Sequence, residues 1–161
     1  GLNFILSFEY CTQNKIKLDY NSIEAFPLTL DVINQTGYAE YVAPAIWNDF
    51  TANYDQALIK AQNISPLCIL EIPHTTLAEF NADRKFDVIY YDAFSVQHQP
   101  EMWSDEMIAH ACSFLKPGGT FVTYAITGKL KRAVKANGFT IEKLPGAPGK
   151  REMLRAVKAL V

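Results

Sequence analysis

The stretch FDVIYYDAFSVQHQPEMW, residues 86–103, decides how the rest of the chain is interpreted. Its first part, Phe86–Tyr91, is aromatic and β-branched, which predicts a covered strand. The strand ends at an acid, Asp92, and a polar loop follows. Ligands of open parallel sheets bind just beyond the carboxyl ends of the strands. Asp92 is therefore a candidate to hold a polar substrate group beside a cofactor. The alternative is that it caps a helix or starts a turn.

Length and composition favour one globular domain. The chain has 161 residues, of which 49% are hydrophobic and 20% are charged. That length supports one domain with a real core and is short for two. No apolar run is long enough to span a bilayer and no signal-peptide pattern opens the chain, so we expect no membrane partner and a cytoplasmic protein.

Cysteines and histidines give no metal-site pattern. The three cysteines lie in apolar surroundings at unrelated spacings, which is typical of reduced core residues, and the three histidines show no ligand spacing. We therefore predict no metal. The residues concerned are Cys11, Cys68, Cys112, His74, His98 and His110.

Charge is unevenly distributed along the chain. Residues 1–115 hold 5 Lys and Arg against 15 Asp and Glu, whereas residues 116–161 hold 10 against 2. This asymmetry favours a basic surface that meets an anionic partner, with nucleic acid the first candidate. The alternative is a solvated face that neutralises the acidic half.

Alternating strand and helix patterns predict an α/β fold with a mainly parallel sheet. We expect strands at Lys15–Ile23, 66–72, 86–91 and 120–125, and an antiparallel hairpin formed by 139–144 and 151–161, most clearly 153–158. We expect helices from residue 1 to about 11, at 27–35, over 38–62 with a break near Pro44, at 75–80, from Asp105 to about Leu115 and at 129–136. Ser104 and Thr127 are the expected N-caps of the last two helices.

The start of the chain resembles part of a nucleotide-binding unit. A buried helix begins almost at residue 1, so Gly1 is interpreted as the last glycine of a strand, glycine-rich loop and helix. We expect the strand and the rest of the loop to lie upstream, which makes the domain N-terminally incomplete. Glu24 follows the next strand, where an acid commonly binds a ribose diol; an acid at a strand end is also common without that role.

Several segments together resemble the methyltransferase domain of the MnmC family, which modifies the wobble uridine of tRNA. They are GLNF at 1–4, IEAFPLT at 23–29, DAF at 92–94 followed by PEMW at 100–103, LKPGGTFVTY at 115–124 and GKREML at 149–154. The resemblance covers nearly the whole chain and is strongest over residues 86–155. It implies a Rossmann-like class I S-adenosylmethionine (SAM) methyltransferase fold over residues 1–161.

The resemblance also implies an activity. This is SAM-dependent methylation of the primary amine of 5-aminomethyl-2-thiouridine at tRNA position 34. The bifunctional form of the family carries an FAD-dependent domain that makes this amine. The present chain has no room for it, so we interpret the chain as the stand-alone methyltransferase.

Five residues of the first half become SAM-binding candidates through this resemblance. Glu24 is expected to hold the ribose hydroxyls, and Gly1 and Asn3 belong to the loop and helix start that approach the cofactor, where a side chain at Gly1 would clash. His74 and Thr75 stand where the family usually has Gly-Asp-Ala, whose acid contacts the adenine end. The change to Pro73 and His74 departs from that pattern.

Asp92 is the catalytic candidate and is also counted among the cofactor contacts. An alkylammonium has no lone pair, so the amine must lose a proton before methyl transfer. Asp92 can orient the amine and accept that proton, directly or through water.

Phe94 and Trp103 are candidates to stack on the uracil, with core packing as the alternative. Lys150 and Arg151 are candidate phosphate contacts, together with Lys129, Lys131 and Arg132. Each is equally interpretable as an ordinary surface charge.

Two other functional classes remain open. One is a methyltransferase or polyamine synthase-like enzyme that acts on a small amine and needs no basic C-terminal segment. The other is a non-catalytic RNA-binding relative that has lost SAM, consistent with the Pro73-His74 change. The sequence gives no oligomeric state.

Overall fold

The computed structural model of the chain describes residues 1–146 and 152–160. It consists of two compact units, Gly1–Phe80 and Asn81–Val161, and each is treated by itself below.

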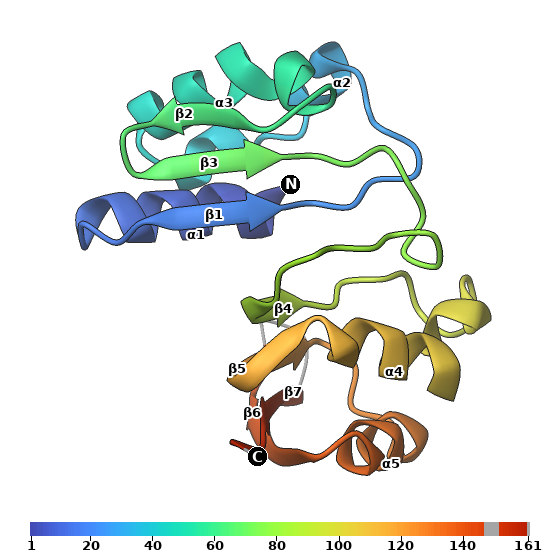
Figure 1. Cartoon of the computed structure of the whole chain (residues 1–161). Helices are drawn as coiled ribbons and strands as arrows, with labels where there is room; N and C mark the ends of the chain where they lie inside the picture. The colour runs from blue at the N-terminus through green and yellow to red at the C-terminus, as the bar shows by residue number, and fades with distance from the viewer. Residues whose placement is uncertain (147–151, 161) are drawn as a thin grey trace. The chain divides into compact units, whose positions relative to one another are not determined.

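The first unit is a three-stranded sheet with helices packed against it (Figure 1). The strand order is β1-β3-β2, with β1 and β3 parallel and β2 and β3 antiparallel. The elements are α1 (Leu2–Gln13), β1 (Leu18–Asn21), α2 (Leu30–Asn34), the 3-10 helix η1 (Tyr38–Tyr41), α3 (Pro44–Ala57), β2 (Gln62–Ser65) and β3 (Cys68–Glu71).

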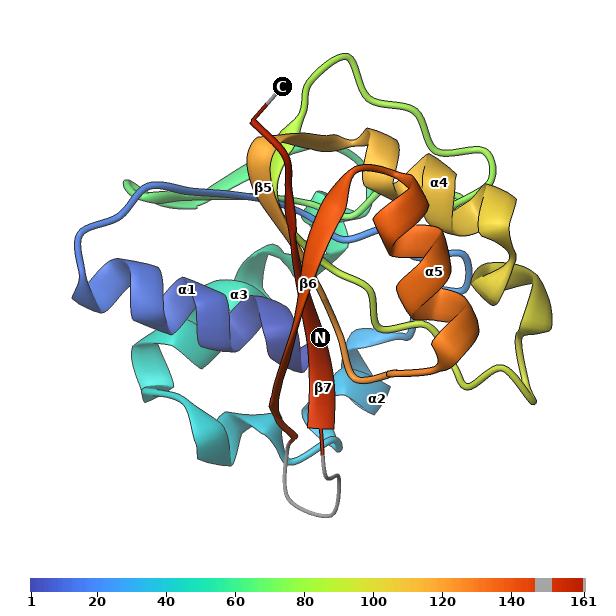
Figure 2. The same ribbon diagram turned by 90° about the horizontal axis from the view of Figure 1, so that it is seen from below.

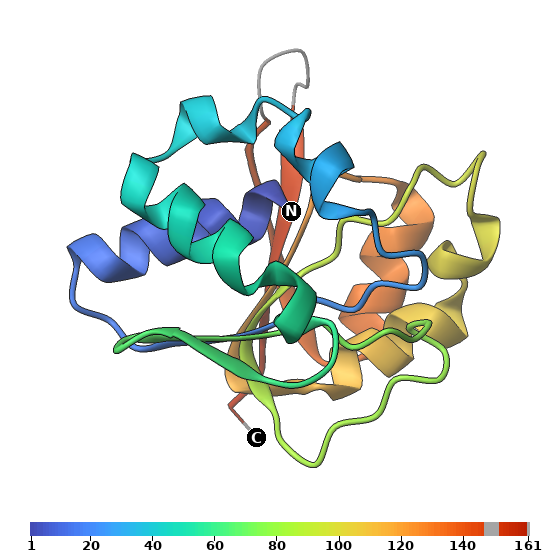
Figure 3. The same cartoon turned by 90° about the horizontal axis from the view of Figure 1, so that it is seen from above.

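Aromatic packing between α1 and α3 builds the core of this unit. Phe4, Ile5 and Phe8 are buried on α1, at the helical spacing predicted from the sequence. The Phe4 ring lies 5.5 Å from the Phe50 ring of α3 and 5.1 Å from the Tyr20 ring of β1. Figure 3 shows α1 and α3 side by side. The two helices are therefore fixed against each other and against β1 by one aromatic cluster.

Several boundaries in the first unit differ from the sequence prediction. Gln62, expected at the end of a helix, begins β2, because the chain turns back to pair with β3 in a hairpin. The helix expected at 27–35 is shorter, since the Thr29 side chain accepts a hydrogen bond from the Val32 N–H and caps α2 there. The brief helix expected at 75–80 is wrong; this segment contains only turns.

The second unit holds a four-stranded sheet in the order β4-β5-β7-β6. Figure 2 shows α4 and α5 side by side on one side of its strands. The elements are β4 (Phe86–Tyr90), the 3-10 helix η2 (Pro100–Trp103), α4 (Asp105–Ser113), β5 (Leu115–Thr123), α5 (Gly128–Ala136), β6 (Phe139–Pro145) and β7 (Glu152–Lys158).

The antiparallel hairpin predicted at the end of the chain is confirmed. β6 pairs with β7 from Phe139 opposite Lys158 to Pro145 opposite Glu152, and β7 pairs antiparallel with β5. β4 and β5 are parallel, as the strand–helix alternation predicts.

Both predicted N-caps of this unit are confirmed. The Ser104 hydroxyl accepts a hydrogen bond from the Met107 N–H at 3.1 Å, and the Thr127 hydroxyl accepts one from the Leu130 N–H at 3.2 Å. These side chains satisfy amide groups that have no partner inside the helix.

β4 is less covered than its sequence predicts. Val88 and Tyr90 are each 45% exposed, whereas Tyr91 is buried with its ring stacked on Phe121. Alternate residues of a strand face opposite sides of the sheet. The face that carries Tyr91 is therefore the one that meets the buried Phe121 ring of β5.

β5 begins earlier than predicted and includes Pro117, Gly118 and Gly119, which were expected to be a helix stop. Helix α4 ends at Ser113, and the register between β4 and β5 shifts between Phe86 and Val88. Gly118 has φ +76°, a conformation that glycine adopts without strain. The irregular first part of β5 thus occupies the segment where the sequence predicted a turn between α4 and the strand.

The described residues contain no group of three metal-ligating side chains and no helix that is long and apolar enough to cross a membrane. Cys68 and Cys112 are buried and Cys11 is half-buried. Burial raises the pKa of Cys68 to about 12 and that of Cys112 to about 11, so both thiols are protonated at neutral pH.

Gly119→Ala tests the close approach of β5 to β4. A methyl group at Gly119 would lie 2.9 Å from the Lys116 carbonyl oxygen and 3.2 Å from that of Asp87. We expect a loss of about 1–3 kcal/mol of unfolding free energy, measured by urea denaturation, because backbone atoms must move. Gly128→Ala is the matched control: its methyl group would meet only the flexible end of Arg132 at 3.4 Å. Equal stability of the two variants would contradict the strand geometry.

Candidate functional site

The first group of candidate residues lies where β1 and β3 end in the first unit. The two segments stay side by side beyond the strands: the Ser22 N–H donates to the Glu71 carbonyl at 2.9 Å, and the Glu24 N–H donates to the Pro73 carbonyl at 3.1 Å. The parallel pairing therefore brings Glu24 next to the segment that contains His74.

The Glu24 carboxylate has one oxygen engaged locally. Oε1 accepts a hydrogen bond from the Phe26 N–H at 3.1 Å. Among residues 1–146 and 152–160, no partner is seen for Oε2. Burial lowers the pKa of the Gly1 amino group and the Glu24 carboxylate raises it, which indicates that the two residues lie near each other. A carboxylate oxygen in this position could accept hydrogen bonds from the two hydroxyl groups of a diol.

Gly1 and Asn3 form the start of α1. The Phe4 and Ile5 N–H groups donate to the Gly1 carbonyl, and no side chain caps this helix end. A methyl group at Gly1 would meet no atom within 4 Å. Among the described residues, no atom would produce the expected clash, which concerns the approach of the cofactor. Asn3 is half-buried, and its carbonyl accepts a hydrogen bond from the Ser7 hydroxyl at 2.7 Å.

His74 and Thr75 continue from β3. His74 is exposed, and its Nε2 lies 3.1 Å from the Ala25 carbonyl oxygen, so it bridges to the residue after Glu24. The Thr75 N–H donates to the Pro73 carbonyl at 3.0 Å, which closes a tight turn. The structure thus brings Gly1, Glu24 and His74 into one region of the first unit.

Tyr54 of α3 contacts this region. It is buried, and its hydroxyl donates to the Leu28 carbonyl at 2.8 Å. Burial raises the pKa of Tyr54, and the carboxylates of Glu24 and Asp55 raise it further, so the hydroxyl remains a donor. Tyr54 therefore ties α3 to the loop that follows Glu24; no periodicity in the sequence reveals this bond.

The second group lies in the loop after β4, in the second unit. Three aromatic side chains donate hydrogen bonds to carbonyl groups of residues 93–102. The Trp103 Nε1–H donates to Phe94 at 2.7 Å, the Tyr124 hydroxyl donates to Ala93 at 2.8 Å, and the Tyr91 hydroxyl donates to Met102. Asp92 is exposed at the beginning of this loop. Hydrogen bonds from these three side chains therefore hold both the beginning and the end of the loop.

Phe94 and Trp103, both predicted to contact the base, have different surroundings. The Phe94 side chain is 71% exposed, and its N–H donates to Gln99 Oε1 at 3.1 Å. Trp103 is 5% exposed, and its ring lies 5.4 Å from Tyr91 and 6.1 Å from Tyr124. The position of Trp103 favours the packing alternative, whereas Phe94 is available to a ligand.

Tyr124 is a neighbour of Asp92 that was not predicted from the sequence. Tyr90 pairs with Val122 in the parallel register, so two residues further along Tyr124 stands beside Asp92. Burial raises the pKa of Tyr124, and the Asp92 carboxylate raises it further. The hydroxyl consequently stays protonated as a donor. An aromatic residue at the end of the strand parallel to β4 is the signal that could have identified it.

Lys150 and Arg151, the predicted phosphate contacts, lie outside the described residues. The basic helix predicted with them is α5, and its cations lie beside β6. The two described groups offer a carboxylate and a helix start in one unit, and a carboxylate with an exposed aromatic ring in the other. These are groups that bind hydroxyls, amines and planar bases.

The comparisons with known proteins agree with this chemistry. The family model described as S-adenosyl-L-methionine-dependent methyltransferase matches residues 41–159. Among curated proteins, the chain is 33% identical over 163 residues to the tRNA 5-methylaminomethyl-2-thiouridine biosynthesis bifunctional protein MnmC of Leptospira borgpetersenii serovar Hardjo-bovis strain JB197. It is 31% identical over 175 residues to the protein of the same name from Magnetococcus marinus. These matches cover 96% and 98% of the chain but 25% of each relative.

A comparison with solved structures gives a similar fold. The crystal structure of MNMC2 from Aquifex aeolicus matches with a TM-score of 0.68 at 16% identity, over 100% of this chain and 50% of that one. This confirms the predicted Rossmann-like methyltransferase fold. Because the family model covers most of the sequence, the chain belongs to the family of S-adenosyl-L-methionine-dependent methyltransferases.

Proposed function

We propose that this chain methylates the primary amine of 5-aminomethyl-2-thiouridine at position 34 of tRNA, to give 5-methylaminomethyl-2-thiouridine. The observation that carries the proposal is the 33% identity, over 96% of the chain, to a protein named for the biosynthesis of that nucleoside. The chain spans 25% of that relative, so the proposal concerns the methyltransferase activity alone. A tRNA substrate places the reaction in the cytoplasm.

In this proposal, residues 1–161 form one methyltransferase domain. The residues that follow β1 and β3 bind the cofactor. Glu24 offers Oε2 to the ribose hydroxyls, and the uncapped start of α1 at Gly1 and Asn3 offers amide groups. His74 and Thr75 form the adjoining wall in place of the Gly-Asp-Ala of the family. SAM supplies a methyl group that its sulfonium charge activates.

Asp92 is the proposed catalytic residue and a proposed cofactor contact. Its exposed carboxylate accepts hydrogen bonds from the substrate amine and orients the nitrogen lone pair. It also takes a proton from the ammonium form, directly or through water, because only the neutral amine is a nucleophile. The fixed loop supports this role, since a positioning carboxylate must itself be held.

Phe94 is the proposed contact of the uracil ring, because its exposed ring stands two residues from Asp92. Trp103 is buried and is proposed only to position Phe94, whose carbonyl accepts a hydrogen bond from the Trp103 Nε1–H at 2.7 Å. Lys150 and Arg151 remain proposed contacts of the tRNA backbone.

The direct test is mass spectrometry of nucleosides from tRNA that has been incubated with the protein and isotopically labelled SAM. The expected product is labelled 5-methylaminomethyl-2-thiouridine in tRNA that carries the free amine. Methylation of a small amine at an equal rate would favour the small-amine enzyme. Absence of SAM binding in a calorimetric titration would favour a non-catalytic RNA-binding relative.

Glu24→Gln tests the cofactor role of the first unit. The amide keeps the size of the side chain but removes the charge from its hydrogen bonds to a diol, so the Kd for SAM should rise about tenfold or more. Isothermal titration calorimetry measures this change. Glu40→Gln, an exposed carboxylate of η1, is the control and should bind SAM like the wild type. Unchanged affinity in Glu24→Gln would remove Glu24 from the site.

Asp92→Asn tests the catalytic role. We expect kcat to fall about a hundredfold, the scale of a positioned acid–base group, while the Kd for SAM stays nearly unchanged. Single-turnover transfer of a labelled methyl group to tRNA measures the effect. Asp105→Asn serves as the control, since Asp105 is exposed in the first turn of α4 and should leave kcat unaltered. A wild-type kcat in Asp92→Asn would exclude Asp92 from the mechanism.

Tyr124→Phe tests whether Tyr124 positions the loop. The variant keeps the ring beside Trp103 but removes the hydroxyl that holds the Ala93 carbonyl. We expect kcat to fall about tenfold, because one hydrogen bond of about 1 kcal/mol is lost and Asp92 loses its fixed orientation. The Kd for SAM should change little, and the unfolding midpoint should fall by only about 2–4 °C, as expected for the loss of one hydrogen bond. A loss of stability with no loss of kcat would assign Tyr124 to packing alone.

A further inference from the structure

A cavity of about 480 Å³ lies between α5 and β6 in the second unit. Its lining is basic, with one apolar residue and one glycine: Gly128, Lys131, Arg132, Lys135, Ile141 and Lys143. All of these residues belong to one unit, within a single α5–β6 connection. The sequence predicts a basic surface within residues 116–161. The cavity shows that four of these cations line one space between α5 and β6.

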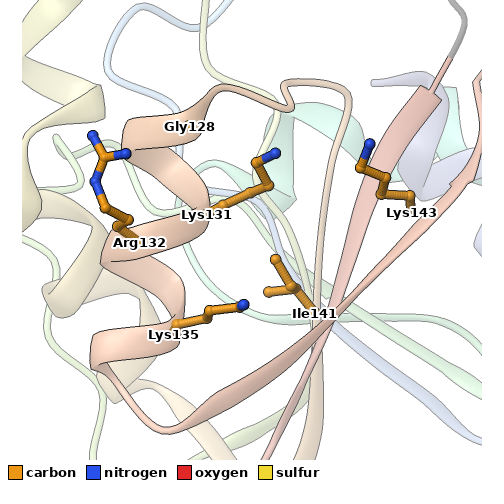
Figure 4. Close-up of a pocket in the computed structure, with 6 residues that line it drawn as sticks. All are labelled: Gly128, Lys131, Arg132, Lys135, Ile141 and Lys143. Atoms are coloured by element: carbon orange, nitrogen blue, oxygen red, sulfur yellow. The ribbon is translucent and has the colours of Figure 1, made fainter.

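Figure 4 shows how the side chains are arranged. Lys131 and Lys135 extend from α5 toward β6, where Ile141 and Lys143 stand. Arg132 lies against the first turn of α5, since its Nη1 would be 3.4 Å from a methyl group at Gly128. Two ammonium groups from a helix and one from a strand therefore surround one space, with the aliphatic side chain of Ile141 at its base.

Most of these cations have no acidic partner. No ion pair is seen for Lys131, Arg132 or Lys135 within residues 1–146 and 152–160. The internal residues outside that range, 147–151, contain no Asp or Glu. Lys143 alone is paired, with its Nζ 3.1 Å from Glu152 Oε2. Within the part of the chain that the structure describes, the cavity thus carries positive charge that no ion pair neutralises.

We propose that this cavity binds a phosphate group of the RNA backbone of the substrate. The inference rests on the proposed function, which supplies a polyanionic substrate. Phosphate oxygens are recognised by Lys and Arg, which contribute affinity and set the register of the nucleic acid. The volume falls within the range of small-molecule sites, and Ile141 offers an apolar wall to the sugar or base attached to that phosphate.

The sequence groups Lys129 with the candidate phosphate contacts, but the structure separates it from Lys131 and Lys135, so it provides an internal comparison. It stands on the same helix and is exposed, yet it does not line the cavity. A general solvated basic face would use Lys129 as much as its neighbours, whereas a phosphate site in the cavity uses Lys131 and Lys135. The chain therefore offers a matched pair of charge changes on one helix.

The test compares Lys131→Gln, Lys135→Gln and Lys129→Gln in the full chain. Binding of a labelled anticodon stem-loop RNA is measured by fluorescence anisotropy at several salt concentrations. We expect each cavity variant to raise the Kd about tenfold and to lower the slope of log Kd against log salt by about one. Lys129→Gln should change the Kd less than about twofold. Lys131→Arg should retain binding, and all variants should melt like the wild type.

Three outcomes would overturn the inference. Equal effects of the three glutamine variants would indicate a diffuse basic face. Displacement of the RNA by inorganic phosphate at concentrations near the Kd of the RNA would indicate a site for free anions. Equal affinity for poly-glutamate of matched charge would indicate an acidic protein partner.

The proposed function is judged separately by methyl transfer of the wild-type protein. If the wild type transfers no methyl group to tRNA, the function fails while the binding series still decides whether the cavity holds RNA. If the wild type transfers methyl groups and the cavity variants keep the KM for tRNA unchanged, the cavity inference fails and the function stands.

Discussion

In the second unit, three hydrogen bonds from aromatic side chains to backbone carbonyls hold the loop that follows β4 in place. A loop that turns back over its own sheet must satisfy its carbonyl groups, since a buried carbonyl without a donor is costly. Tyr91, Trp103 and Tyr124 provide those donors from three places in the chain. The side chains also pack on one another, so a single cluster serves as core and as support. Asp92 and Phe94 can therefore be exposed without being loosely held.

The cluster depends in turn on the parallel register of β4 and β5. Tyr90 opposite Val122 fixes which residue of β5 follows the loop, and a shift by one residue would turn Tyr124 to the other face of the sheet. The close contact at Gly119 and the register shift after Phe86 occur at the opposite end of the same strand pair. The pairing at the start of β4 and β5 thus fixes the register that places Tyr124 beside the loop after β4.

The sequence predicted features that depend on local rules and missed those that depend on partners. Helix caps at Ser104 and Thr127 and the final hairpin were predictable because the caps and turns lie next to the elements that they affect. The strand β2 was missed because its β structure comes from pairing with β3. Glu24 and Asp92 were placed at strand ends correctly, but the burial of Trp103 and the role of Tyr124 required the register of the sheet. The basic cavity required α5 and β6 to be folded against each other.

In the proposed function, two separate parts of the second unit bind the reacting base and the RNA backbone. The aromatic-held loop presents a carboxylate and one exposed ring, which suit a neutral amine on a planar base. The cavity between α5 and β6 presents cations, which suit a phosphate and would repel an ammonium. In the proposed function, the phosphate site contributes affinity without altering the charge beside the reacting nitrogen. In the same proposal, a cation placed at the loop would pair with Asp92 and weaken the proposed hydrogen bonds between that carboxylate and the amine.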